Sequence, residues 1–174
     1  MLPQRNILAN ARRYFGPEMW GFMRLALFQP DIPQNLGTLI RFGACLGIPI
    51  DVIEPCGFPL GDRGIRRAAL DYAAYAEIVR HRSWESFRDA RRAERLVLLS
   101  TRAEKPYHQF DFAASDCLVV GSESAGVPMH LHGEFAQTLR IPMRKGPRSL
   151  NVALAAAMVT GEALRQIGHL SSLE

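Results

Sequence analysis

The chain has 174 residues, of which 48% are hydrophobic and 22% charged, and its formal net charge is +4. These values predict one compact domain that can bury its own core. The longest apolar stretches, residues 96–99 and 152–159, fall short of the roughly 20 residues of a membrane-spanning helix. The N-terminus has no secretory signal pattern. We therefore expect a cytoplasmic protein with no membrane partner.

The first segment, residues 1–22, is basic and carries aromatic residues, and Met23 stands one residue before the first predicted strand. We interpret residues 1–22 as an over-called or optional N-terminal extension, with Met23 as the natural start. Residues 23–170 are then the domain itself.

Short apolar runs bounded by Gly, Pro or charge are typical of buried strands. Helical patterns alternate with them, which indicates a single-domain α/β fold with a mostly parallel sheet flanked by helices. The predicted strands are residues 24–29, 49–54, 76–80, 95–100, 117–121 and 138–142. The predicted helices are residues 35–46, 62–70, 83–93 and 149–167, with a shorter one near 128–134.

The first candidate motif follows the first strand, where open α/β sheets bind ligands. It runs from Pro30 to Arg41. We expect Asn35 to cap the following helix and Arg41 to lie on its inward side. An ordinary helix start with an interfacial arginine is the alternative.

The second motif spans residues 118–128, where a strand ends in a glycine turn at Gly121. It lacks the glycine spacing of a dinucleotide fold or a P-loop. The third motif, Ile141 to Asn151, joins a strand, a basic Gly-Pro loop and a Ser-x-Asn at a predicted helix start. Such a place gathers positive charge and backbone donors, which suits a nucleotide-like ligand.

The chain has 21 Lys and Arg residues against 17 Asp and Glu residues, which suits contact with a polyanion, and all but two of the 21 are arginine. A planar guanidinium suits phosphate, although a GC-rich genome would also favour arginine. Aromatic residues such as Tyr72 close the arginine-rich segment, a mixture that suits RNA. The candidate RNA contacts are Arg66, Arg67, Arg144, Lys145 and Arg148.

Metal chemistry is not expected, since the five histidines lack ligand spacing beyond one His-x-His. The cysteines Cys45, Cys56 and Cys117 lie far apart without a Cys-x-x-Cys pair, which argues against a zinc site and a disulfide framework.

In this order, the three motifs resemble those of the SPOUT superfamily of knotted RNA methyltransferases, over nearly all of residues 23–169. Motif one is Asn35-x-Gly37-x-x-x-Arg41, motif two is Gly121-x-Glu123-x-x-Gly126-x-Pro128, and motif three is Ile141-Pro142-Met143 with Ser149-Leu150-Asn151. Residues 53–58 and 66–72 are similar to the tRNA (cytidine/uridine-2′-O-)methyltransferases that modify the wobble nucleotide.

The resemblance implies a C-terminal trefoil knot, S-adenosylmethionine as cofactor, tRNA as substrate and a homodimer built on helices 35–46 and 149–167. Ribosomal RNA as substrate, a catalytically silent RNA-binding module and a plain nucleotide-binding protein are the alternatives. By position, the cofactor would contact Leu99, Ser100, Gly121, Ile141, Met143 and Ser149.

The resemblance also implies the catalytic residues, which are Arg41, Asn35, Ser149 and Asn151. Because a guanidinium is a poor base near neutrality, we expect Arg41 to hold a phosphate or stabilise the alkoxide while the other three orient the hydroxyl. Two positions depart from the family pattern, Ala125 and Gly161. A glycine inside a helix costs about 1 kcal/mol, so we expect close backbone packing at Gly161.

Overall fold

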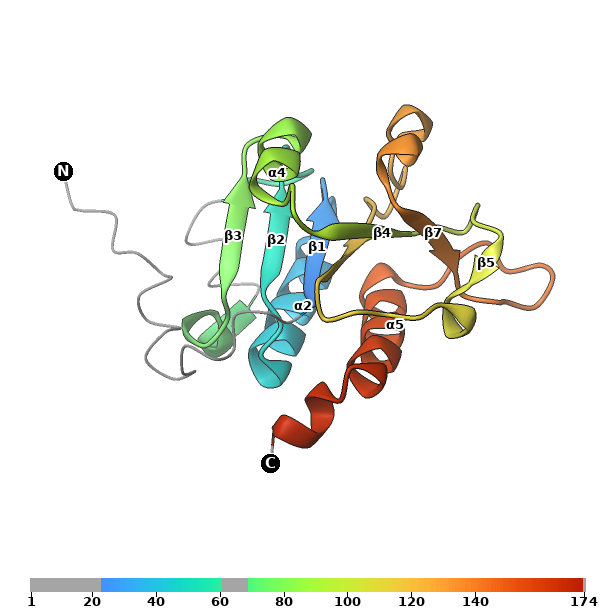
Figure 1. The fold of residues 1–174 in the computed structure, drawn as a ribbon. Coiled ribbons are helices and arrows are strands. Elements are labelled where there is room, and N and C mark those ends of the chain that lie inside the picture. The colour runs from blue at the N-terminus through green and yellow to red at the C-terminus, as the bar shows by residue number, and fades with distance from the viewer. Residues whose placement is uncertain (1–22, 61–68, 174) are drawn as a thin grey trace.

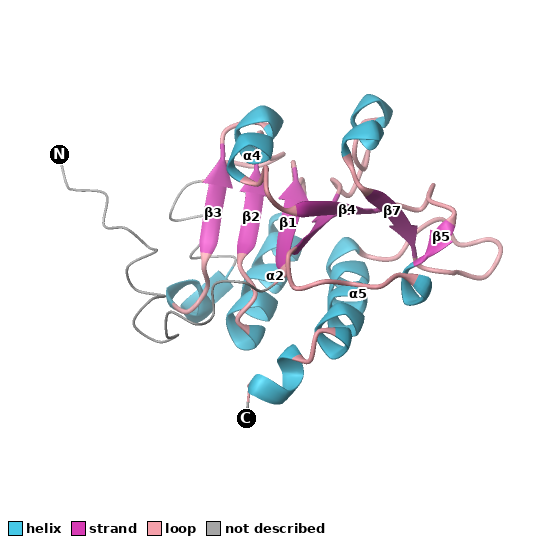
Figure 2. Ribbon diagram, in the orientation of Figure 1, coloured by secondary structure: helices cyan, strands magenta, loops and turns pink. Residues whose placement is uncertain are grey.

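The computed structural model describes residues 23–60 and 69–173. The predicted helix at 62–70, with Arg66 and Arg67, lies almost entirely outside the described residues, as does the segment 1–22. The described chain forms an α/β fold, as predicted, with one sheet and helices against both of its faces (Figures 1 and 2).

The sheet has seven strands in the order β3-β2-β1-β6-β4-β7-β5, and every pair is parallel. All six predicted strands are present. The sequence missed β5, because two residues give no periodicity to recognise. The strands are β1 Arg24–Phe28, β2 Ile50–Ile53, β3 Ile78–His81, β4 Arg95–Leu99, β5 Lys105–Pro106, β6 Asp116–Val120 and β7 Gln137–Arg140.

Residues 23–60 and 69–173 contain three α-helices and four short 3-10 helices, of which the last α-helix and the last 3-10 helix follow the final strand. Ser83 caps α4 by accepting a hydrogen bond from the Ser86 amide, and Gly47 ends α2 with a left-handed φ of 66°. The predicted short helix near 128–134 is the 3-10 helix η4. The α-helices are α2 Pro33–Leu46, α4 Trp84–Ala90 and α5 Val152–Gln166; the 3-10 helices are η2 Leu70–Ala74, η3 Tyr107–Gln109, η4 Met129–Glu134 and η5 His169–Ser172.

Two predicted helix starts were wrong. Helix α2 begins at Pro33, after Ile32, because proline fixes a helical φ and needs no amide partner in the first turn; Asn35 is therefore inside the helix and is not its cap. Helix α5 begins at Val152 after the N-cap Asn151, so Ser149 belongs to the preceding loop.

The core lies on both faces of the sheet, since successive side chains of a strand point to opposite sides. Leu25 and Leu27 of β1 pack in one cluster with the inward sides of α2 and α5. Phe28 packs in the other cluster with Trp84 and Phe87 of α4. One face therefore carries the two long helices, and the opposite face carries α4.

Gly161 in α5 does not have the close backbone contact predicted for it. A Cβ added there would meet no atom within 4 Å. Steric crowding within the described residues therefore does not explain the glycine at this position. The trefoil knot implied by the family resemblance stays a prediction, because strand order and pairing do not by themselves establish it.

Candidate functional site

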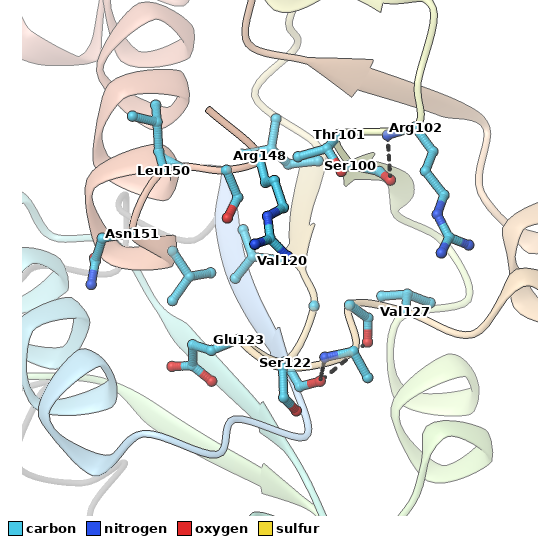
Figure 3. Close-up of a pocket in the computed structure, with 18 of the residues that line it drawn as sticks. Ser100, Thr101, Arg102, Val120, Ser122, Glu123, Val127, Arg148, Leu150 and Asn151 are labelled. Atoms are coloured by element: carbon cyan, nitrogen blue, oxygen red, sulfur yellow. Dashed lines mark hydrogen bonds between the residues drawn. The ribbon is translucent and has the colours of Figure 1, made fainter. Parts of the chain in front are cut away.

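A pocket of about 680 Å³ opens at the carboxyl ends of β4, β6 and β7 (Figure 3). Loops after parallel strands meet at this edge of a sheet, which is where α/β proteins bind ligands. All six residues predicted to contact the cofactor line it: Leu99, Ser100, Gly121, Ile141, Met143 and Ser149. Whether they bind a cofactor stays a prediction, but the fold brings them to one place.

Hydrogen bonds of Ser100 hold the β4 and β7 side of the pocket in place. The Ser100 amide, just beyond β4, donates to the Leu139 carbonyl of β7 at 2.8 Å. The Ser100 hydroxyl accepts from the Arg102 amide at 3.2 Å (Figure 3). These bonds fix the loop after β4 beside the strand that leads to Ile141.

The turn after β6 forms the second side of the pocket. The Gly126 amide donates to the Ser122 carbonyl at 2.9 Å, and Gly126 has a left-handed φ of 71°. A Cβ on Gly121 would lie 2.5 Å from the Gly126 Cα. Glycine at 121 is therefore required by the close return of the turn, and this side presents backbone to the pocket.

The start of α5 forms the third side. The Asn151 Oδ1 caps the helix by accepting from the amides of Ala153 at 2.9 Å and Leu154 at 3.2 Å. Ser149 and Arg148, in the loop before the cap, also line the pocket. The positive end of the α5 helix dipole favours electronegative ligand groups on this side.

Three side chains join these loops in one hydrogen-bonded relay, defined here as Glu123, Asn35 and Asn151. The Asn35 Nδ2 donates to the Glu123 Oε1 at 2.8 Å, and its Oδ1 accepts from the Asn151 Nδ2 at 2.9 Å. Asn35 is only 7% exposed. Since the Glu123 carboxylate can only accept, the Asn35 amide is fixed in a single orientation.

Asp31 and Glu123 form a second connection, which sequence reasoning missed. The Asp31 amide donates to the Glu123 Oε2 at 2.9 Å, and the Asp31 carboxylate accepts from the Ser124 amide and hydroxyl. Side-chain contacts with Glu123 and Ser124 lower the pKa of Asp31. Asp31 lies in the first motif and Glu123 in the second. The position of Glu123, two residues after the glycine at 121, is the feature of the sequence that could have pointed to this contact.

Arg41 does not lie where the sequence predicted. Its side chain is exposed, and it is absent from the pocket wall that includes Asn35. Leu36, Ile40 and the glycine at 43 occupy the inward side of α2, which leaves Arg41 on the outer side. Its Cζ stands 4.5 Å from the centroid of the Tyr72 ring.

The predicted basic contacts are divided between the pocket and the outer surface. Arg148 lines the pocket (Figure 3). Arg144 and Lys145 are exposed and lie off the pocket wall. Arg102, which the sequence reading did not select, stands at the rim with its side chain pointing away from the centre (Figure 3).

The Cys56 thiol is partly buried and lies near Glu54. Burial and the charge of Glu54 raise the pKa of the Cys56 thiol to about 11, so it stays protonated at neutral pH. Across residues 23–60 and 69–173, His, Cys, Asp and Glu form no group that could hold a metal ion. No helix in the same ranges is long and apolar enough to cross a membrane.

Known proteins are similar to this chain in both sequence and architecture. A protein of Beijerinckia indica named tRNA (cytidine(34)-2'-O)-methyltransferase is 52% identical over 86% of this chain and 94% of its own. A structure described as concerning the 2-OH methylation of C/U34 on tRNA matches with TM-score 0.79 and 38% identity, covering 87% of this chain and 98% of that chain.

A more distant solved structure is the SpoU methyltransferase AviRb of Streptomyces viridochromogenes in complex with AdoMet. It matches with TM-score 0.74 and 28% identity, over 84% of this chain and 60% of that chain. The family model of the SpoU rRNA methylases matches residues 22–161. The motifs, the sheet and these matches agree, and the chain belongs to the SpoU rRNA methylase family.

Proposed function

We propose that this chain transfers the methyl group of S-adenosylmethionine to the ribose 2′-hydroxyl of the wobble cytidine or uridine, position 34, of tRNA. The observation that carries the proposal is the match to the Beijerinckia protein of that name, at 52% identity across 94% of its length. The solved structure whose description names C/U34 on tRNA supports the same substrate. A tRNA-modifying enzyme of this kind would act in the cytoplasm.

The pocket suits the proposed donor in size and in chemistry. Small-molecule sites commonly measure about 300–1,000 Å³, and this pocket measures about 680 Å³. Apolar side chains at the strand ends, Leu99 and Ile141, can take a flat base. The close turn at Gly121 brings backbone groups to the same cavity, where they can bond ribose and amino-acid groups. When bound, S-adenosylmethionine supplies an electrophilic methyl group.

The residues of the chain then have to align the reactants. Alignment at near-attack distance can supply roughly 7–11 kcal/mol of the barrier. Asn35 and Asn151 each use one Nδ2 hydrogen in the relay, which leaves the second available to orient a hydroxyl. We propose that these two side chains and Ser149 direct the ribose hydroxyl toward the donor.

Arg41 is proposed to hold an RNA phosphate. A guanidinium has a pKa above about 12 and does not act as a base near neutrality. Its exposed position outside the pocket wall supports a contact with the substrate backbone. Replacing Arg41 with lysine should lower kcat/KM for tRNA, because the planar two-pronged contact is lost; unchanged turnover would remove that requirement.

A homodimer belongs to the same proposal. Leu154 and Met158 lie four residues apart on one side of α5, and Leu150 lies in the loop just before the helix; the three are 65%, 47% and 43% exposed, respectively. An apolar row of this kind suits burial against a second copy. Leu154→Glu should convert a dimer to a monomer in light scattering, whereas Arg165→Glu, further along α5, should not.

Two rival functions differ in simple measurements. Ribosomal RNA is favoured by the family name alone, and methyl transfer to purified ribosomal RNA but not to tRNA would support it. A silent RNA-binding module is indicated by calorimetry if S-adenosylmethionine does not bind at millimolar concentration. In cells, deletion of the gene should abolish the 2′-O-methylated wobble pyrimidine in digested tRNA, measured by mass spectrometry.

A further inference from the structure

Arg41 and Tyr72 form a pair on the outer side of α2, away from the pocket. Tyr72 belongs to η2, and its ring packs partly buried against the core cluster that includes α2. The Tyr72 carbonyl accepts from the amides of Tyr75 at 3.0 Å and Ala76 at 3.1 Å. The backbone that carries the ring is thereby held in place, and the ring presents a face to the Arg41 guanidinium at 4.5 Å.

A second arginine in the molecule shows what such stacking provides. The Arg95 Cζ stands 4.8 Å from the centroid of the Phe110 ring. With its face covered, Arg95 directs its edge at the Asp116 carboxylate, through Nε at 2.5 Å and Nη2 at 2.8 Å. A ring below the guanidinium plane thus leaves the in-plane donors free for a two-pronged bond to an anion.

Arg41 has the same stacking but no anion. Within residues 23–60 and 69–173, its guanidinium makes no hydrogen bond or ion pair, and its side chain is exposed. Three acidic side chains satisfy other arginines at the amino ends of the strands: Asp51, Glu77 and Asp116. The Arg41 donors therefore remain available to a ligand from outside the described chain.

We propose that Tyr72 is a positioning residue, whose ring orients the Arg41 guanidinium for edge-on binding of an RNA phosphodiester. This inference rests on the proposed function, since it assumes an RNA substrate. It adds a residue outside the pocket, acting through Arg41 rather than on the methyl donor. Tyrosine serves here as a flat support, so its ring matters and its hydroxyl does not.

The test is a double-mutant cycle on methyl transfer to tRNA. Tyr72→Phe and Tyr72→Trp keep a ring and should stay within about 2-fold of the wild-type kcat/KM, whereas Tyr72→Leu should lower it by about 2- to 30-fold, the range of a cation-π contact. Combined with Arg41→Ala, Tyr72→Leu should have no further effect. Arg92→Ala, which removes an exposed arginine from the turn after α4, is the control for lost charge.

Affinity for S-adenosylmethionine separates positioning from misfolding. Neither residue lines the pocket, so each variant should bind the donor within about 2-fold of the wild type in calorimetry. Normal kcat/KM in Tyr72→Leu, or losses that add in the double variant, would overturn the role of Tyr72.

Failure of the proposed function would look different, because the wild type itself would then transfer no methyl group to tRNA. In that case the same cycle is measured on tRNA affinity. Additive losses of affinity there would overturn the inference, and non-additive losses would support it.

Discussion

Two polar clusters lie at opposite ends of the parallel strands and differ in burial and in charge. At the amino ends, Asp51 is fully buried and bonds Arg24 at 2.8 Å, His81 at 2.6 Å and Arg91 at 2.8 Å. At the carboxyl ends, the relay joins a carboxylate to two neutral amides, and Asn151 is exposed.

The buried Asp51 cluster is suited to stabilising the fold, whereas the relay is suited to orienting a ligand. Burial opposes ionisation of Asp51, yet the His81 hydrogen bond and the charges of Arg24 and Arg91 outweigh it and hold the pKa well below the usual range. The partners of that carboxylate are all side chains of the protein itself. The relay keeps unused amide hydrogens beside an open pocket, which suits a site that must bond a substrate.

The largest expected effect comes from breaking the buried cluster. Asp51→Ala takes the buried carboxylate away from Arg24 and Arg91 and should lower the free energy of unfolding by about 3–5 kcal/mol, measured by urea denaturation. Asp89→Asn removes an acid from an exposed pair with Arg92 and should cost less than about 1 kcal/mol. Equal losses in the two variants would erase the contrast between buried and exposed charge.

Acid should weaken the same cluster. The pKa of an unfolded Asp is about 3.9, and the pKa of folded Asp51 is lower. Its stabilisation is therefore complete above about pH 5 and is lost as the pH falls toward the folded pKa, because the unfolded chain takes up a proton that the folded chain does not. The stability gap between the wild type and Asp51→Asn should shrink from pH 7 to pH 4. A constant gap contradicts the low pKa.

Replacing Asn35 tests the other cluster, the relay at the carboxyl ends of the strands. Asn35→Ala takes one bond from Glu123 and one from Asn151, at a cost of about 1–3 kcal/mol in stability. Misplaced reactants should lower kcat/KM for methyl transfer by about 100-fold. Thr38→Ala, on the exposed side of the same helix, should leave the rate unchanged. A rate loss no greater than that of Thr38→Ala would exclude the relay from alignment.

The smallest effect on stability is expected from Asn151→Asp. The carboxylate can still cap α5 and is favoured at a helix start, so the free energy of unfolding should change by less than about 0.5 kcal/mol. The donor to the Asn35 Oδ1 is lost, and turning the Asn35 amide would set its oxygen against Glu123. We expect kcat/KM to fall about 10-fold with an unchanged melting temperature. A normal rate would show that capping is the only role of Asn151.

Local pattern determined most of the fold and the candidates for the site. Apolar runs with Gly and Pro boundaries located six strands, and the required glycine at 121 marked the close turn. The two wrong helix starts arose because a neighbouring residue, rather than the expected one, decided where the helix begins. Pro33 moved the start of α2 ahead of Asn35, and the cap at Asn151 moved the start of α5 from the predicted Ser149 to Val152.

The sequence by itself determined the α/β class, the family resemblance and the residues that meet at the pocket, because periodicity and turn chemistry are written in neighbouring residues. Only the tertiary structure decided what those residues do to one another. The partners in the relay stand 88 and 116 positions apart along the chain, and the stack of Arg41 on Tyr72 joins two separate elements. Such contacts depend on where loops from different strands converge, and no local pattern encodes that.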